Sequence, residues 1–306
     1  MGFYVLKRFL YSILTLLIVV TVTFMLMHEI PGSIYTGEKK LPAAIERNIK
    51  AKYGLDQPLY RQYLKMLDNL AHLDFGDSMI SQGRSVNKII GDHFPVSAKL
   101  GLISIFLCLL AGIPLGIASA LHKDKWQDYI SMIVATLGVT IPSFVVATLS
   151  QYFLSVKLGI FPVIGFKSVW HAVLPAVALS FFPLSFIARL VRSSMVETLE
   201  QDFIRTARAK GLSESTVVYK HALKNALLPV VTYLGPLTAS ILTGSFIIER
   251  IFNIPGLGRY FVDSISNRDY TVIMGVTVFY AVFLIIMNFI VDIIYLFIDP
   301  RIKLIR

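Results

Sequence analysis

Six stretches of this sequence carry no charged residue over about 20 or more positions, and they restrict the fold more than any other feature. An apolar helix of about 20 residues spans the ~30 Å hydrocarbon layer of a bilayer. Within that layer the backbone has to satisfy its own hydrogen bonds, so each stretch is expected to be helical. The sequence therefore predicts an all-α integral membrane protein with about six transmembrane helices, at 9–28, 100–121, 129–156, 168–188, 225–248 and 270–291.

Composition agrees with lipid as the solvent. Of the 306 residues, 55% are hydrophobic and only 16% are charged, whereas a soluble domain carries about 25% charged residues. The net charge of +10 comes from Lys and Arg in short segments between the apolar stretches. This placement favours contact with anionic membrane lipid and argues against a nucleic acid partner. Cys108 is the only cysteine, which excludes an intramolecular disulfide and a thiol-rich metal site.

The first stretch follows Lys7 and Arg8, as the apolar part of a signal peptide would. At 20 residues it is longer than such a region, and no small-residue cleavage site follows it, so we expect a retained anchor. Several stretches contain prolines, which membrane helices tolerate as kinks. An alternative for 168–188, which holds two prolines and His171, is a re-entrant segment.

Lys and Arg in the connecting segments indicate the orientation, because they are enriched on the cytoplasmic side. They predict cytoplasmic segments at 1–8, 122–128, 189–224 and 292–306, so both termini are expected in the cytoplasm. The resulting organisation is an N-terminal tail and first helix, an extracytoplasmic helical segment, a core of five transmembrane helices containing a cytoplasmic loop at 193–224, and a cytoplasmic tail. Their bounds are 1–30, 31–98, 99–299 and 300–306.

The extracytoplasmic segment is expected to form a small helical cap. Residues 43–52 are typical of a short helix that stops at Gly54. Asp56 and Pro58 are start signals for a second helix that reaches about Leu70. Apolar residues from Val86 to Phe94 repeat the helical spacing before Pro95.

Signatures of catalysis are missing from the sequence. It contains no Gly-Lys pair, which excludes the common phosphate-binding loop, and no H-E-x-x-H, C-x-x-C or G-x-S-x-G motif. We therefore predict no catalytic, cofactor-binding or metal-binding residues. His171 and Asp292 fit the membrane interfaces better than a proton relay at the midplane. A self-contained carrier or channel and a membrane enzyme remain the competing classes, and a partner is the expected source of energy.

The loop at 193–224 is the candidate receiver of that energy. Phe203, Ile204, Ala207 and Gly211 fall on one helical face, and Gly211 is a natural helix stop. Ser213 is a suitable N-cap for a second helix. Such a face can dock in the groove of a soluble partner or lie on anionic lipid, and periodicity alone leaves both open.

This loop resembles the conserved cytoplasmic loop of binding-protein-dependent ABC importer permeases. The resemblance rests on Phe-Ile-Arg-Thr-Ala-Arg-Ala-Lys-Gly-Leu at 203–212 and His-Ala-Leu-Lys-Asn-Ala-Leu-Leu-Pro at 221–229. The family's Glu-Ala-Ala start is Arg205-Thr206-Ala207 here, and its later proline is Lys224. These departures resemble the B-type permeases of oligopeptide, dipeptide and nickel importers. Further matches to that subfamily lie at 53–60, 74–78, 254–259, 267–270 and 299–301, so the resemblance covers the whole chain.

The resemblance implies a type I importer permease fold in a bacterial plasma membrane, and a subunit that translocates peptides. A nickel or metal-chelate substrate is the alternative. The implied partners are a homologous C-type permease, one or two cytoplasmic ATPases that bind ATP and Mg²⁺, and an extracytoplasmic peptide-binding lipoprotein. The segment implied to couple to the ATPase comprises Phe203, Ile204, Arg205, Thr206, Ala207, Arg208, Ala209, Lys210, Gly211 and Leu212.

Two further sets of residues are candidate sites. The outer motifs suggest a docking surface for the binding protein at Tyr53, Asp56, Pro58, Asp74, Gly76, Pro255, Gly256, Gly258 and Arg259. Small hydroxyl side chains within the apolar stretches suggest a polar translocation path or, alternatively, helix-packing contacts. The candidates for the path are Thr140, Ser143, Thr238 and Thr243.

Overall fold

The computed structural model describes residues 2–29, 48, 51, 53–81 and 83–298, and these form helices and short connections. Within those ranges the one β pairing is a single bridge between Asp77 and Ser85. The predicted helix at 43–52 and the tail at 300–306 fall largely or wholly outside the described residues. The all-α prediction is confirmed for the part of the chain that the structure describes.

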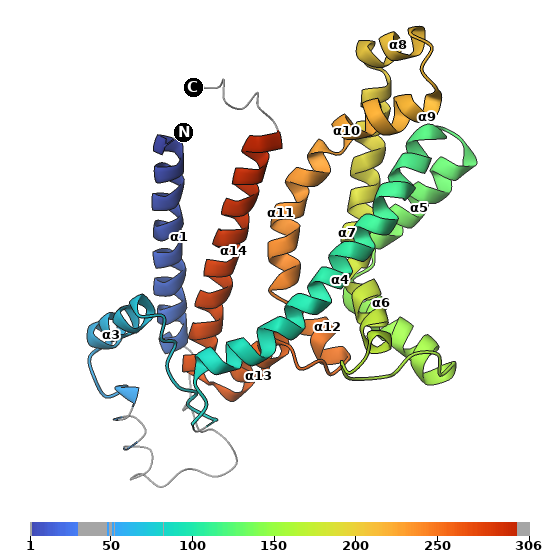
Figure 1. Cartoon of the computed structure of the whole chain (residues 1–306). Helices are drawn as coiled ribbons and strands as arrows, with labels where there is room; N and C mark the ends of the chain where they lie inside the picture. Colours follow the sequence, from blue (N-terminus) through green and yellow to red (C-terminus); the bar gives the residue numbers. More distant parts are fainter. Residues whose placement is uncertain (1, 30–47, 49–50, 52, 82, 299–306) are drawn as a thin grey trace. The chain divides into compact units, whose positions relative to one another are not determined.

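Five of the described helices are long and apolar enough to cross a membrane, or up to six spans are present if one bent helix pair is counted as a span. This agrees with the prediction of about six spans. The corresponding elements in Figure 1 are α1 (Gly2–Glu29), α4 (Val86–Leu121), the bent pair of α5 (Trp126–Thr140) and α6 (Ser143–Ser150), α7 (Val169–Leu199), the stretch formed by α11 (Leu228–Leu242) and α12 (Phe246–Ile251), and α14 (Tyr270–Ile298).

The predicted span at 129–156 is divided into two helical parts. Here α5 (Trp126–Thr140) is followed by α6 (Ser143–Ser150) and a π-helical turn, η1 (Gln151–Lys157), with a bend of 101° between the two parts. Pro142 explains the break, because a residue before proline avoids the helical conformation. Ile141 accordingly has an extended backbone, with φ of −82° and ψ of 121°.

The re-entrant alternative for 168–188 is wrong. α7 continues without a break through Pro175 and Pro183 to Leu199, which lies beyond the predicted end of the span. Each proline removes one backbone donor, and a membrane helix accommodates that loss through local adjustment. A proline within an apolar stretch therefore does not by itself determine whether the helix breaks; the surrounding structure does.

The predicted span at 225–248 is interrupted as well. It consists of the end of α10 (Leu223–Ala226), α11, and α12 (Phe246–Ile251). Gly244 has a φ of +91°, which an L side chain rarely adopts, and it turns the chain between α11 and α12. α4 begins at Val86, so the predicted short helix from Val86 to Phe94 is the first part of α4, which continues through Pro95.

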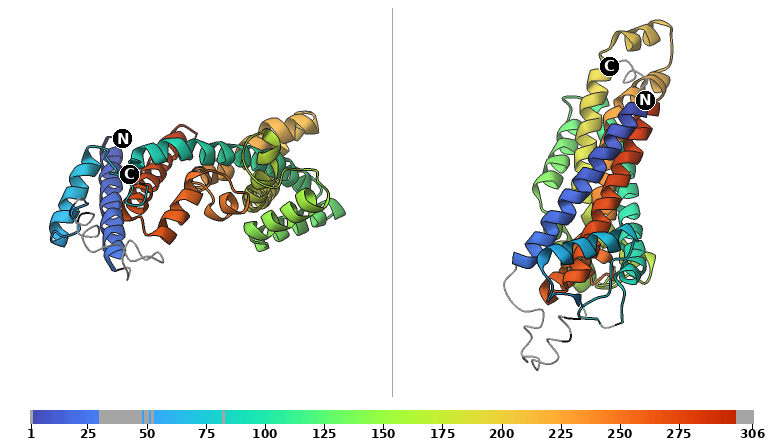
Figure 2. Two further views of the ribbon diagram at one scale, coloured as in Figure 1. Left: turned by 90° about the horizontal axis from the view of Figure 1, so that it is seen from below. Right: turned by 90° about the vertical axis from the view of Figure 1, so that its left-hand side faces the viewer.

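The chain divides into two compact units. The first contains Met1–Phe94 and Tyr260–Ile285. Within it α1 and α14 lie side by side (Figure 1 and Figure 2), and Val20 of α1 is buried against Met274 and Val278 of α14. α3 (Leu59–Ala71) begins directly after Pro58, as predicted, and its Tyr63, Met66 and Leu67 pack on this pair.

The second unit contains Pro95–Arg259 and Ile286–Arg306. Within it α8 (Asp202–Ala209) and α9 (Glu214–Thr216) lie at one end of α7, whereas α6 and α12 lie near the opposite end (Figure 1). α4 and α7 pack closely, because a Cβ atom on Gly116 would meet the carbonyl oxygen of Ala188 at 2.6 Å. Gly112, one turn earlier, lies in the same way 2.8 Å from the carbonyl oxygen of Leu184.

Candidate functional site

The predicted coupling segment forms α8 and the turn that follows it. α8 begins just after α7 ends, and its two buried side chains are Ile204, which is 0% exposed, and Ala207. Both belong to the main apolar core of the second unit, together with Met195, Val217 and Ala222. The helix is therefore fixed to its own chain through an apolar face.

This burial corrects the predicted docking face. Ile204 and Ala207 lie on the side that contacts the chain itself, whereas Phe203 is 44% exposed and Leu212 is 39% exposed. The other exposed residues of the predicted segment are Arg205, Thr206, Arg208, Ala209, Lys210 and Gly211. The exposed part of the segment thus includes two large apolar side chains and three cations. The role of these residues in coupling stays a prediction.

The turn after α8 has the geometry that the sequence predicts. Gly211 has a φ of +76°, and its N–H donates to the carbonyl oxygen of Arg208 at 2.9 Å. The Ser213 hydroxyl caps α9 by accepting a hydrogen bond from the Thr216 N–H. The guanidinium of Arg208 donates to both carboxylate oxygens of Glu214, at 2.8 and 3.2 Å, and this pairing raises the pKa of Arg208. The turn is therefore closed by contacts on both of its sides.

A π-helical turn follows, η2 (Val217–Ala222), which connects α9 to α10. Val217, Val218 and Ala222 are buried in the same core as Ile204. π-helical turns within α-helices occur frequently at functional sites. The path from α8 to α11 thus contains one irregular turn and a further break at Leu227, where α10 ends.

Two of the three outer motifs in the first unit, at 74–78 and 267–270, meet at Asp269. The Asp269 carboxylate accepts a hydrogen bond from the Ser78 hydroxyl at 2.5 Å and one from the Met79 N–H at 3.1 Å. It also accepts from the N–H of Val272 at the start of α14. Asp269 is 3% exposed and belongs to the motif at 267–270, but it was not among the predicted site residues.

The predicted docking residues of this unit surround that contact. Tyr53 donates from its hydroxyl to the carbonyl oxygen of Ser78 at 2.9 Å. Asp74 accepts from the Gly76 N–H at 2.9 Å, and Gly76 has a φ of +78°. Asp56 and Pro58 are exposed before α3. The structure explains how these residues shape the loops, and binding-protein docking stays a prediction.

In the second unit the loop at 254–259 is built around a buried carboxylate, that of Glu249, which is 0% exposed. Glu249 accepts a hydrogen bond from the Ser97 hydroxyl at 2.7 Å and one from the Arg259 N–H at 2.9 Å. Gly256 and Gly258 are buried against it, because Cβ atoms there would collide with its side chain. Of the four predicted docking residues in this loop, Pro255 is exposed and Arg259 is partly exposed.

The four candidates for the translocation path differ in what their side chains contact, and their role in the path stays a prediction. Thr140, Thr238 and Thr243 donate from their hydroxyls to carbonyl oxygens of their own helical turns, at 2.8, 2.6 and 2.9 Å. This local bonding leaves their path role without support from the geometry. Ser143 lines a cavity of about 430 Å³ between α6, α7 and α11, whose other polar lining residues include Ser240 and Tyr233.

One buried ion pair, between Asp128 and Arg192, was not predicted from the sequence. Asp128, at the start of α5, is 3% exposed and binds Arg192 of α7. The two residues are 64 positions apart, so no local spacing rule connects them. The signal in the sequence was only a carboxylate placed directly before an apolar stretch.

Comparison with known families accounts for the motifs. A family described as "Binding-protein-dependent transport system inner membrane component" matches residues 112–304. A second, described as "Binding-prot-dependent transport system membrane comp, N-term", matches residues 1–102.

Individual relatives match over nearly the full chain. The dipeptide transport system permease protein DppB of Bacillus subtilis is 50% identical over 304 residues, which is 99% of both chains. The oligopeptide transport system permease protein OppB of Escherichia coli K12 is 44% identical over 302 residues, covering 98% of this chain and 99% of that one.

Solved structures share the fold at lower identity. A chain of the MetNI methionine ABC transporter, in an inward-facing conformation, aligns with a TM-score of 0.57 and 19% identity, covering 69% of this chain and 96% of that chain. A chain of an amino acid ABC transporter aligns with a TM-score of 0.55 and 14% identity, covering 68% and 94%. At this identity the likeness establishes the permease fold alone.

Proposed function

Because the chain belongs to the family of binding-protein-dependent transport system inner membrane components, we propose that it is the permease subunit of an ATP-driven importer of peptides. The observation that carries the proposal is the identity of 44–50% to DppB and OppB permeases over almost the whole length. The names of these relatives favour a dipeptide or oligopeptide over a nickel chelate. The absence of a phosphate-binding motif in the sequence agrees with a subunit that hydrolyses no ATP itself.

The proposed complex contains a homologous C-type permease, one or two cytoplasmic ATPases that bind ATP and Mg²⁺, and an extracytoplasmic peptide-binding lipoprotein. The chain lies in the bacterial plasma membrane with both termini in the cytoplasm. In that orientation α8 projects from the cytoplasmic end of α7, and the outer segment with α3 faces the binding protein. The exposed side chains Phe203 and Leu212 are the apolar contacts offered to the ATPase.

The mechanism follows from how α8 is attached. Closure of the ATPase dimer on ATP displaces α8, and the buried Ile204 and Ala207 carry that displacement to the core that they share with α7 and η2. The two permeases then open outward and receive the peptide, and ATP hydrolysis reverses the movement. The coupling segment has to bind one ATPase conformation more tightly than the other, because a ligand shifts an equilibrium only by its differential affinity.

Reconstitution tests this function. The chain is purified with its proposed C-type permease and ATPase partners, placed in proteoliposomes, and supplied with binding protein and labelled peptide. We expect peptide uptake that requires ATP on the side of the membrane where the ATPases lie. Unlabelled dipeptides or oligopeptides should compete with the labelled peptide, and a nickel chelate should not. The chain reconstituted alone is the control. Uphill uptake by that control, or transport of the nickel chelate instead of peptide, contradicts the proposal.

A further inference from the structure

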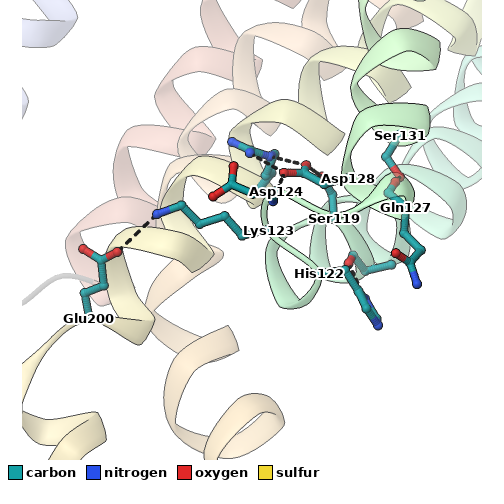
Figure 3. Close-up of polar contacts among 10 residues, drawn as sticks. Ser119, His122, Lys123, Asp124, Gln127, Asp128, Ser131 and Glu200 are labelled. Carbon is teal, nitrogen blue, oxygen red and sulfur yellow. Dashed lines mark hydrogen bonds and ion pairs between the residues drawn. The ribbon is translucent and has the colours of Figure 1, made fainter.

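The cytoplasmic ends of three helices meet at the Asp128 carboxylate. Arg192 of α7 donates to it through Nε and Nη2, at 2.6 Å each. The Ser119 hydroxyl, near the end of α4, donates at 2.5 Å, and the Asp124 N–H, in the turn between α4 and α5, donates at 3.0 Å. Figure 3 shows Ser119 and Asp124 on either side of Asp128. One side chain thus joins α4, α5 and α7.

The pair is built in a way that favours a single arrangement. Both oxygens of Asp128 accept an Arg192 hydrogen bond, and each accepts one further donor, so the buried charge is satisfied. Removing either partner leaves an uncompensated charge, which is strongly unfavourable. A buried ion pair adds little net stability compared with an apolar pair, and its best-attested use is to specify one geometry.

The turn between α4 and α5 depends on the same carboxylate. Asp124 has a φ of +62°, which lies in the left-handed region that residues with a side chain rarely adopt. Its N–H donates a hydrogen bond to the Asp128 carboxylate. The ammonium of Lys123 in the same turn donates to the Glu200 carboxylate at 3.4 Å, and Figure 3 draws this contact. Glu200 lies directly after α7 and two positions before the start of α8. This exposed ion pair contributes little to the free energy of folding, but it places the turn beside the start of α8.

Close helix contacts continue from the ion pair along the bundle. Gly112 and Gly116 bring α4 against the backbone of α7, and Gly138 brings α5 against Ser185 and the carbonyl oxygen of Phe181. Small residues at such positions let membrane helices pack with little space between their backbones. α4, α5 and α7 therefore form a tightly packed block, and Asp128 closes its cytoplasmic end.

We propose that Asp128 and Arg192 are positioning residues for energy coupling, which fix α4 and α5 to α7 so that a displacement of α8 moves all three helices together. Without the pair, α7 moves with α8 while the turn between α4 and α5 is left behind, and ATP hydrolysis no longer produces the full movement. This inference rests on the proposed function, because it presumes that α8 receives work from an ATPase.

Coupling is measured as ATP hydrolysed per peptide imported, with complexes normalised to their permease content. We compare Asp128→Asn, which removes the charge but keeps the shape, with Arg192→Lys, which keeps the charge but loses the two-pronged contact. The control is Lys7→Gln, because Lys7 is exposed near the start of α1 and belongs to none of the proposed sites. We expect the ratio to rise by about five-fold or more in Asp128→Asn, by less in Arg192→Lys, and not in the control.

The outcomes separate this inference from the function that underlies it. A wild-type complex that imports no peptide refutes the proposed function. If the wild type imports peptide and both variants assemble with its ratio, the positioning role is refuted. An equal fall in hydrolysis and uptake, or loss of assembly in both variants, assigns the pair to folding and likewise overturns the inference. A raised ratio in assembled complexes, with the smaller effect in Arg192→Lys, supports it.

Discussion

Gly211 shows what a single residue contributes to the turn after α8. Its φ of +76° lies in the left-handed region, yet a Cβ atom there would meet nothing within 4 Å. Gly211→Val therefore introduces backbone strain of about 1–2 kcal/mol without a steric clash. Such a cost lowers the population of the observed turn by about 5–30-fold. We expect normal membrane insertion and a marked fall in ATP-dependent uptake.

Gly211→Asn is the matched control, because asparagine tolerates the left-handed region better than other residues with a side chain. Its uptake should lie between those of the wild type and Gly211→Val. Uptake is measured in proteoliposomes, and insertion is measured by recovery from membranes. Undiminished uptake in the valine variant would mean that this turn does not transmit movement.

Glu249 makes a second prediction for a single residue. Every described partner of its carboxylate is a donor: the Ser97 hydroxyl and the N–H groups of Gly258 and Arg259. Glu249→Gln turns an amide N–H₂ toward donors, and one buried group loses its partner. We expect a loss of about 1–3 kcal/mol of stability, seen as a lower thermal unfolding temperature in detergent. Glu197→Gln, at an exposed position of α7, should leave that temperature unchanged; an equal effect in both variants would contradict the argument.

Among the elements, α8 presents two faces with different tasks, and neighbouring residues separate them. Ile204→Ala removes a fully buried side chain and should lower permease stability by about 2–5 kcal/mol. Phe203→Ala truncates a side chain that is 44% exposed and should leave permease stability nearly unchanged while weakening assembly with the ATPase. Thermal unfolding of the permease and co-purification of the ATPase measure the two effects. If Phe203→Ala lowered permease stability and Ile204→Ala weakened only the assembly, the assignment of the two faces would be wrong.

The sequence predicted several elements because their signals are local. The spans of α1 and α14, the start of α3 after Pro58, and the turn at Gly211 each follow from neighbouring residues. The bend at Pro142 was not predicted, because membrane helices commonly tolerate a proline as a kink. Pro175 and Pro183 lie inside a continuous helix, so tertiary surroundings decide which proline breaks a span.

The contacts within the candidate site depend still more on tertiary structure. The helical face of Phe203, Ile204 and Ala207 was recognisable from spacing, but spacing does not state whether that face meets a partner or the chain's own core. The pairing of Asp128 with Arg192 joins helices that are distant in sequence. The position of Asp128 before an apolar stretch does not identify its partner, and only the fold brings the two residues together.

At the level of the whole molecule, the orientation in the membrane decides which surfaces can meet which partners. Lys and Arg in the connecting segments predict that α8 is cytoplasmic and that the segment before α3 is outside. Cysteine labelling tests this cleanly, because the one natural cysteine, Cys108, is fully buried and should react little with a charged reagent. The suitable positions are Asp56, exposed before α3, and Lys210, exposed after α8.

A membrane-impermeant maleimide should label Asp56→Cys in intact protoplasts, whereas Lys210→Cys should react only after the membrane is opened. α8 can receive work from an ATP-consuming partner only on the side of the membrane where ATP is present. A binding protein can deliver substrate only from the other side. Labelling of Lys210→Cys in sealed protoplasts would place α8 where no ATPase can reach it. The exposed Phe203 and Leu212 would then need a different partner, and the coupling role of Asp128 and Arg192 would lose its basis.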